Sequence, residues 1–213
     1  MNVVDTEKAF REAIEARKEA GTVREQLGCG NRLMVLFVGT MTDQKRVDRL
    51  LHAYATLKEY HASSLLVLVG DGPSRAASEQ LARELSIASQ AIFLGDIFDG
   101  VARYFEAADL VVVPGTGGLV ISEAMVHGKP VVSSVGDGVE RDLIVPGLNG
   151  ELVGPDSAEE LATAIGRCLS EPDRLKMMGE ASRKRIQEGC NIEAYINELV
   201  AGVVTAHQTV TNR

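Results

Sequence analysis

The residues best suited to chemistry lie in a glycine-rich turn that leads directly into a segment carrying a carboxylate. An apolar run ends at Pro114, the turn covers residues 115–118, and Glu123 follows shortly afterwards. A helix that begins at Gly118 presents free backbone N–H groups and the positive end of its dipole, an arrangement suited to phosphate. Glu123, about one turn inside, can accept hydrogen bonds from hydroxyl groups. This pattern fits a nucleoside diphosphate with its ribose, although an ordinary glycine-rich loop beside a solvated Glu stays the alternative.

The elements that position this turn are short apolar runs separated by amphipathic segments. The runs are nearly continuous in apolar residues, which is typical of strands buried on both faces of a parallel sheet. The segments between them show the apolar spacing of three and four that predicts helices. The chain is therefore expected to form one α/β domain with a single doubly wound, Rossmann-like parallel sheet flanked by helices. The expected strands cover 33–38, 65–69, 91–94, 110–113 and 131–134, and the expected helices cover 5–20, 47–57, 78–85, 158–169 and a stretch from Pro172, with a tight-turn excursion over 143–153.

Glycine follows each of the five expected strands, at the edge where open parallel sheets bind ligands. Lys45 is the one cation of the first loop that lies near a helix start, and its ammonium is suited to a diphosphate. A solvated surface Lys is the alternative reading. Arg49, one turn further along, could add to the positive electrostatic field around Lys45, but we expect Arg46 and Arg49 to be surface side chains. His127 is expected to be a helix cap or a surface residue.

Composition and charge exclude several classes of protein. A net charge of −8 over 213 residues, aromatics at 4 % and the absence of Trp argue against nucleic acid as a partner. Three widely spaced cysteines suggest neither a zinc site nor disulfides, and a reducing compartment suits them. No signal-peptide pattern and no apolar run of about 18 residues is present, so a soluble, cytoplasmic protein is expected. No His, Asp or Glu spacing predicts a metal site.

The sequence lacks the best-known nucleotide-binding fingerprints. Residues 39–42 read Gly-Thr-Met-Thr, which departs from the glycine pattern of dinucleotide-binding folds, and no P-loop pattern occurs. Gly70-Asp71-Gly72-Pro73 is a strong turn signal, and we expect Asp71 to serve the turn.

Several motifs together resemble one known family. Residues 35–51, 66–75, 91–115, 118–132 and 145–153 are similar to the donor-binding half of the retaining GT-B glycosyltransferases, the large "group 1" family. The similarity extends from Asn2 to about Val200, and the stretch from Pro114 to Pro130 is its most specific part. It implies one half of a GT-B fold and a nucleotide-sugar donor as substrate.

The resemblance also assigns roles to individual residues. It implies that Lys45 neutralises the diphosphate and that Glu123 binds the ribose hydroxyls, which makes this pair the expected catalytic residues. It implies that the amides of Gly118, Leu119 and Val120 hold the phosphates and that no metal or other cofactor is needed. The base is expected near Asp96 and Ile97, and backbone contacts to the donor are expected along Gly39, Thr40, Gly70, Gly115 and Gly117.

Two residues depart from the family pattern. Gly115 stands where the family has the first Glu of an E-x7-E motif, and Thr40 stands where an Arg often precedes the Lys. Each lost charge-assisted hydrogen bond is worth on the order of 1.5–3 kcal/mol, so donor affinity or choice is expected to differ from the family norm.

The resemblance further implies a domain organisation and a missing partner. We expect a leading segment and helix over 1–28, a nucleotide-sugar-binding domain over 29–204 and a disordered tail over 205–213. The family's acceptor-binding N-terminal domain is not in this sequence, and any peripheral membrane contact would come through it. The leading hypothesis is thus the donor-binding domain of a retaining hexosyltransferase, inactive by itself. The alternatives are a non-catalytic nucleotide-sugar-binding or regulatory domain and, with less support, an NAD-dependent oxidoreductase domain.

Overall fold

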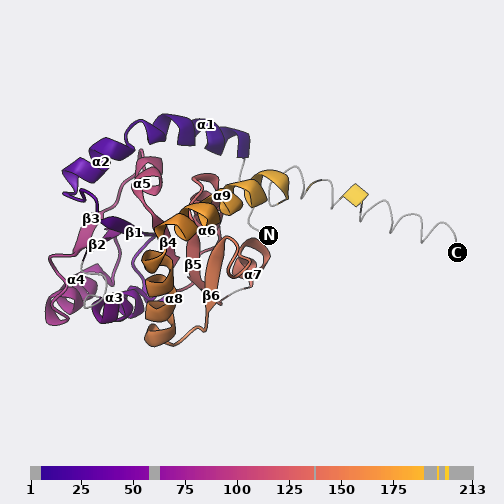
Figure 1. Ribbon diagram of the computed structural model, residues 1–213. Coiled ribbons are helices and arrows are strands. Elements are labelled where there is room, and N and C mark those ends of the chain that lie inside the picture. The colour runs from indigo at the N-terminus through magenta and orange to yellow at the C-terminus, as the bar shows by residue number, and fades with distance from the viewer. Residues whose placement is uncertain (1–5, 58–62, 137, 190–195, 197–199, 202–213) are drawn as a thin grey trace, which may run out of the picture.

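The protein is built around one parallel sheet, as a computed structural model shows for residues 6–57, 63–136, 138–189, 196, 200 and 201 (Figure 1). Its strands have the order β3-β2-β1-β4-β5-β6, and every neighbouring pair runs parallel. The predicted doubly wound α/β fold is confirmed. The strands are β1 (Leu33–Val38), β2 (Ser64–Val69), β3 (Ala91–Gly95), β4 (Leu110–Val113), β5 (Val131–Ser134) and β6 (Gly150–Val153).

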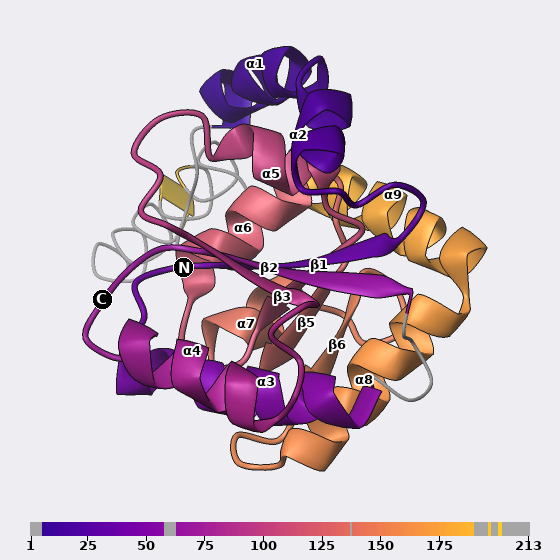
Figure 2. The same ribbon diagram turned by 90° about the vertical axis from the view of Figure 1, so that its left-hand side faces the viewer.

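Helices cover both faces of the sheet, as the end-on view shows (Figure 2). Helices α1, α2, α5 and α6 lie on one face, and α3, α4 and α8 lie on the other, while α9 packs against α6 and α8. The helices are α1 (Thr6–Arg17), α2 (Ala20–Gln26), α3 (Val47–Leu57), α4 (Arg75–Glu84), α5 (Ala102–Ala107), α6 (Gly118–Val126), α7 (Val139–Leu143), α8 (Ala158–Ser170) and α9 (Pro172–Glu188), with a short 3₁₀ helix, η1 (Asp43–Lys45), before α3.

The apolar runs form strands because both of their faces are buried. All residues of β2 and β4 are buried, and consecutive side chains alternate between the two hydrophobic cores that the sheet separates. Leu66 and Leu68 pack with α3 and α8, whereas Leu65 and Val67 pack with α5 and α6. Burial of apolar surface on both sides, at about 25 cal/mol per Å², explains why these runs read as continuous rather than alternating.

Three local features differ from expectation or refine it. The helix expected over 5–20 is broken after Arg17 and resumes at Ala20. The excursion expected over 143–153 contains a sixth strand, β6, which the sequence pattern did not reveal. Ser157 is the residue that caps α8, since its hydroxyl accepts the N–H of Glu160. The segments expected to lead in (residues 1–5) and to form the tail (205–213) lie outside the described residues.

The sheet has a topological switch point between β1 and β4. The crossover from β1 to β2 passes through α3 on one face, and the connection from β4 to β5 passes through α6 on the other. The helices that follow these two neighbouring strands therefore lie on opposite faces of the sheet (Figure 2). The carboxyl edge between them, the switch-point crevice, is where such folds bind ligands. In the part of the chain that the structure describes, no helix has the length and apolarity needed to span a membrane.

Candidate functional site

The cation and the glycine-rich turn singled out in the sequence meet at this switch point. Lys45 ends η1, directly after β1, and its ammonium donates a hydrogen bond of 2.5 Å to the carbonyl of Thr116. A second link joins the same segments, because the Thr116 N–H donates to the Gln44 carbonyl at 3.3 Å. The structure therefore brings Lys45 to the mouth of α6, across 71 residues of sequence.

The turn opens a helix whose first amides point away from the core. Helix α6 begins at Gly118, and the preceding Gly117 has an extended φ of 173° and provides no side-chain cap. Among the described residues, the N–H groups of Gly118, Leu119 and Val120 have no hydrogen-bond partner, as expected for a first helical turn. Leu119 is 60 % exposed, so this end of the helix faces solvent. Free amides, a helix dipole and an adjacent ammonium make a site suited to an anion.

Glu123 lies on the same helix, in the turn that follows the free amides. Its side chain is 30 % exposed, so it belongs neither to the core nor to the open surface. A helix rises about 1.5 Å per residue, which puts Glu123 about 7 Å beyond Gly118 along the axis. That separation is appropriate for a pentose next to a phosphate bound at the helix mouth.

Gly115 accounts for the close approach of the two loops. A Cβ at this position would lie 2.1 Å from the Gln44 carbonyl oxygen and 2.9 Å from the Lys45 carbonyl carbon, so no side chain fits there while η1 keeps its place. The hollow between Lys45, the turn and Val120 has a volume of only about 10 Å³, room for about one water molecule. Gly115, which was expected to replace a carboxylate of the family pattern, thus lies in a turn packed tightly against η1.

The other residues expected to line the crevice occupy the neighbouring loops. Gly70 is buried, and a Cβ on it would meet the Gly39 carbonyl oxygen at 2.0 Å, so packing of these loops accounts for this glycine. Thr40 and Asp96 are exposed, and Ile97 is half-buried in the loop after the edge strand β3. Their contacts with a donor stay predictions. Asp71 serves its turn, as expected. Its carboxylate accepts one hydrogen bond from the Gly72 N–H and another from the Arg75 guanidinium, each 2.7 Å long.

Arg49 is a residue that sequence reasoning misplaced. It was expected at the surface, yet it is only 2 % exposed. Its guanidinium donates to the Ser134 hydroxyl at 2.8 Å and to carbonyl groups in the loops after β4 and β6. Burial lowers the pKa of Arg49, and no carboxylate hydrogen-bonds to it among the described residues. The cation therefore holds two loops at the carboxyl edge, through the carbonyl of Pro114 after β4 and those of Gly154, Pro155 and Ser157 after β6.

His127 was expected to be a helix cap or a surface residue, and the first of these alternatives is confirmed. It does end α6, but its side chain is fully buried rather than at the surface. Its Nδ1 lies 2.9 Å from a carboxylate oxygen of Glu106, a buried residue of α5 that the sequence analysis did not single out. The only sequence signal for Glu106 is a lone acid within the apolar stretch from Phe105 to Ala108.

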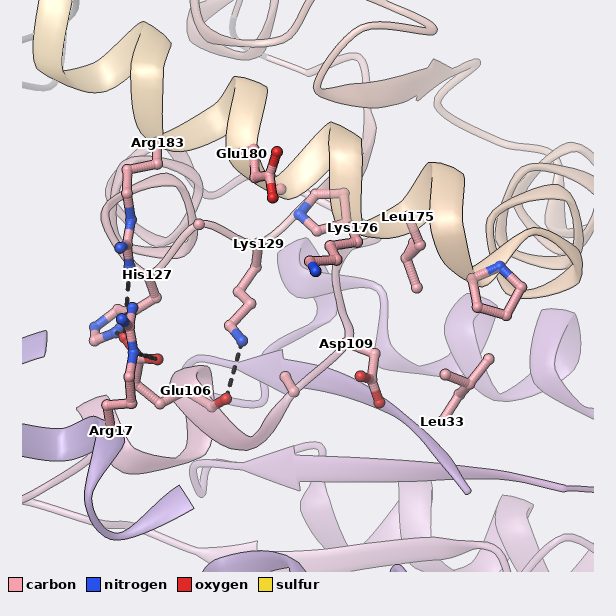
Figure 3. Close-up of a pocket in the computed structure, with 15 residues that line it drawn as sticks. Arg17, Leu33, Glu106, Asp109, His127, Lys129, Leu175, Lys176, Glu180 and Arg183 are labelled. Carbon is pink, nitrogen blue, oxygen red and sulfur yellow. Dashed lines mark hydrogen bonds and ion pairs between the residues drawn. The ribbon is translucent and has the colours of Figure 1, made fainter. Parts of the chain in front are cut away.

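A large hollow lies at the opposite edge of the sheet. It has a volume of about 630 Å³ and is lined by residues that precede β1, β4 and β5 and by one face of α9 (Figure 3). Arg17, Lys129 and Arg183 approach Glu106 there, and Asp109 and Glu180 lie nearby. Because crossover geometry places ligands at the carboxyl edge, we take the switch-point crevice as the candidate active site.

Comparison with known proteins agrees with this geometry. Residues 21–185 match the family model for glycosyl transferases group 1. An uncharacterised glycosyltransferase of Methanocaldococcus jannaschii is 33 % identical over 172 residues, which are 78 % of this chain and 42 % of the relative. A GDP-mannose-dependent phosphatidylinositol monomannoside mannosyltransferase of Mycolicibacterium smegmatis is 28 % identical over 191 residues, 84 % of this chain and 49 % of the relative.

Solved structures give the same result. HepE of Anabaena, crystallised with UDP, superposes with a TM-score of 0.78 at 25 % identity, over 89 % of this chain and 53 % of that one. The same protein has also been crystallised with UDP-glucose. This chain spans about half the length of the relatives it matches.

Proposed function

We propose, from the premise that this chain belongs to the glycosyl transferases group 1 family, that its switch-point crevice binds a nucleotide-sugar donor. The observation that supports this most is the meeting of Lys45 with the mouth of α6, since an ammonium lies beside free amides with Glu123 further along the helix. Similar proteins bind UDP and UDP-glucose or depend on GDP-mannose, so a nucleoside diphosphate is the ligand class that agrees with both lines of support.

The proposed chemistry is transfer of a hexosyl group with retention at the anomeric carbon. The C–O bond between the sugar and the nucleoside diphosphate breaks, a bond to an acceptor hydroxyl oxygen forms, and the hydroxyl proton leaves with the nucleoside diphosphate. Lys45 and the amides of residues 118–120 stabilise the charge that develops on the departing diphosphate. To do so, the ammonium exchanges its bond with the Thr116 carbonyl for one with a phosphate oxygen. Glu123 accepts the ribose hydroxyls, and no metal is required.

The acceptor is proposed to be bound by a second domain that faces this crevice. The chain spans about half of its relatives, and GT-B transfer needs both halves to close around the reacting sugar and exclude water. The chain by itself is therefore expected to bind donor and to transfer little.

One observation favours a second candidate, a domain that binds nucleotide sugars without catalysis. Gly115 replaces the carboxylate expected near the donor sugar, and its tight packing against η1 leaves little room at that position. Sugar transfer or donor hydrolysis by the chain would dismiss this candidate. The NAD-binding alternative keeps only the doubly wound sheet in its favour.

A calorimetric panel tests the proposal. UDP, GDP, ADP, the corresponding sugar conjugates and NAD are titrated separately into the 213-residue chain, with Mg²⁺ and with EDTA. The expected result is binding of one nucleoside diphosphate in both solutions. Binding of NAD but of no nucleoside diphosphate would overturn the assignment, and a strict need for Mg²⁺ would overturn the role given to Lys45.

A further inference from the structure

His127 is wedged between two carboxylates that come from different helices. Its side chain has no exposed surface, Nδ1 lies 2.9 Å from Glu106 Oε1, and Nε2 lies 3.4 Å from Glu123 Oε1. The Phe105 ring stacks on the imidazole, with centroids 5.3 Å apart and planes within 8°. Nε2 makes no hydrogen bond of good geometry among the described residues, so its contact with Glu123 is an ion pair when the ring is charged. The imidazole thus connects Glu123 of α6 with Glu106 of α5.

The protonation state of the ring decides whether this connection attracts or repels. With the Nδ1 proton given to Glu106, a neutral ring turns a lone pair on Nε2 toward the Glu123 carboxylate, whereas an imidazolium donates to both acids. Burial by itself lowers the pKa of His127, but hydrogen bonds and charges from Glu106 and Glu123 outweigh it and raise the pKa. The arrangement therefore favours the imidazolium over the neutral ring.

Glu106 is a fixed anchor for the ring. Arg17 of α1 donates to its carboxylate at 3.2 Å, Arg183 of α9 lies 3.9 Å away, and Lys129 binds its main-chain carbonyl at 2.9 Å (Figure 3). Burial raises the pKa of Glu106, and bonds from His127 and Arg17 outweigh it, so the pKa is lowered and the acid stays ionised. Three cations from different segments keep this carboxylate, and through it the imidazole, in one place.

We propose that His127 is a positioning residue for Glu123: it holds one oxygen of that carboxylate so that the other faces the ribose hydroxyls. The inference rests on the proposed function, in which Glu123 binds the ribose. Ribose recognition is then strongest while both ring nitrogens carry protons, and it weakens as pH rises and Nε2 loses its proton. The groups that set this behaviour are Glu123 and Glu106, with Arg17, Lys129 and Arg183 behind Glu106.

Two amide substitutions separate the two contacts of the ring. The Asn amide nitrogen takes about the place of Nδ1, so His127→Asn keeps the bond to Glu106 and loses the contact with Glu123. The Gln amide nitrogen takes about the place of Nε2, so His127→Gln keeps a neutral donor for Glu123. We expect His127→Asn to weaken UDP binding about fivefold at pH 6.5, the equivalent of one net hydrogen bond, and His127→Gln to stay within about twofold.

The probes are UDP and 2′,3′-dideoxy-UDP, or the guanosine pair if GDP binds more tightly. Because Glu123 acts on the hydroxyls, His127→Asn should leave the dideoxy affinity within about twofold of wild type and shrink the preference for UDP. A merely structural role for His127 would lower both affinities together. Thermal unfolding of each variant shows that it is folded at the assay temperature.

The pH profile gives an independent readout. From pH 6.5 upwards, UDP affinity of the wild-type chain should fall relative to that of His127→Gln, because Gln does not titrate and the ionisation of UDP cancels in the comparison. Glu106→Gln removes a charge that raises the pKa of His127, so the fall should move to lower pH. If His127→Asn does not fold, the pH profile of Glu106→Gln tests the positioning role instead.

The outcomes separate this inference from the proposed function. If the wild-type chain binds neither UDP nor GDP, the proposed function fails and the role of His127 fails with it. If the wild type binds but both His127 variants keep the full preference for the ribose hydroxyls, or the pH profile is unchanged by Glu106→Gln, only the positioning role is overturned.

Discussion

The mouth of the crevice and the buried charges of the protein use the same residue types in opposite ways. Lys45 at the mouth is half-buried and bound to a single carbonyl, and Glu123, further along α6, keeps about a third of its side chain in solvent. Arg49 and Glu106, at opposite edges of the sheet, are almost fully buried, and each makes several polar contacts. Charges that await a ligand are left partly unsatisfied, whereas charges that fix the loops are satisfied within the protein. The first set should govern binding and the second should govern stability.

Arg49→Met offers the largest test of this contrast. The substitution removes the donor that satisfies the Ser134 hydroxyl and the carbonyls of two loops, leaving buried acceptors unpaired. We expect the free energy of unfolding to fall by about 3 kcal/mol. Urea denaturation followed by circular dichroism measures it.

The control for Arg49→Met is Arg83→Ala. Arg83 is exposed on α4 and bonds only to the Gln80 side chain among the described residues. It should change stability by less than about 0.5 kcal/mol. Equal effects of the two substitutions would remove the distinction between the buried charges and the surface.

Gly115→Ala tests the packing of the turn against η1. The added Cβ would meet the backbone of Gln44 and Lys45, which cannot rotate away as a side chain could. A loss of about 2 kcal/mol in unfolding free energy is expected from this overpacking. Gly21→Ala is the matched control, because the helical Gly21 has nothing within 4 Å of its Cβ position, and it should stabilise by up to about 1 kcal/mol. Changes in unfolding free energy of the same sign for the two substitutions would contradict the packing argument.

The pair of His127 and Glu106 predicts a pH dependence of stability. The pKa of His127 is raised above 6.5, so its contribution is complete below pH 6.5 and is lost as pH rises through the folded-state pKa. The pKa of Glu106 is lowered below 4.5, so its contribution is present above pH 4.5 and is lost as pH falls. Stability should therefore be greatest between these limits.

Urea denaturation at several pH values from 5 to 9 checks this dependence against His127→Gln. The wild type should lose stability above pH 6.5 with a slope of at most one proton, and the variant should lack that decline. Parallel profiles for the two proteins would show that the ring does not titrate as described.

Arg46→Gly has the smallest predicted effect and concerns the junction between η1 and α3. Arg46 directs the chain from η1 into α3 and has a left-handed φ of 51°. Its ion pairs with Asp48 and Asp156 are exposed and contribute little. Glycine relieves the strain at some cost in unfolded-chain entropy, so a net gain of about 0.5 kcal/mol is expected. Arg46→Ala, which keeps the strain, should bring no gain in the same denaturation assay.

The sequence was informative where local pattern determines structure. Continuous apolar runs identified five strands, and glycines at strand ends led to the edge that holds Lys45 and α6. It was uninformative where contacts join distant segments. Arg49 lies on the expected helix, but its partners are 65 to 108 residues away, and no spacing rule shows that they surround it. The His127–Glu106 contact depends likewise on how α5 packs beside α6. Strand β6 was missed because glycine and a charged residue interrupt its apolar pattern.

The central claim is that Lys45 binds the diphosphate, and Glu123 the ribose hydroxyls, of one nucleoside diphosphate. Calorimetric titration of the preferred diphosphate into the wild-type chain, Lys45→Ala and Glu123→Ala tests it most directly, with thermal unfolding as a check on folding. Each substitution should weaken binding about 10-fold or more, and each variant should stay folded at the assay temperature. Wild-type affinity in both variants would contradict the account.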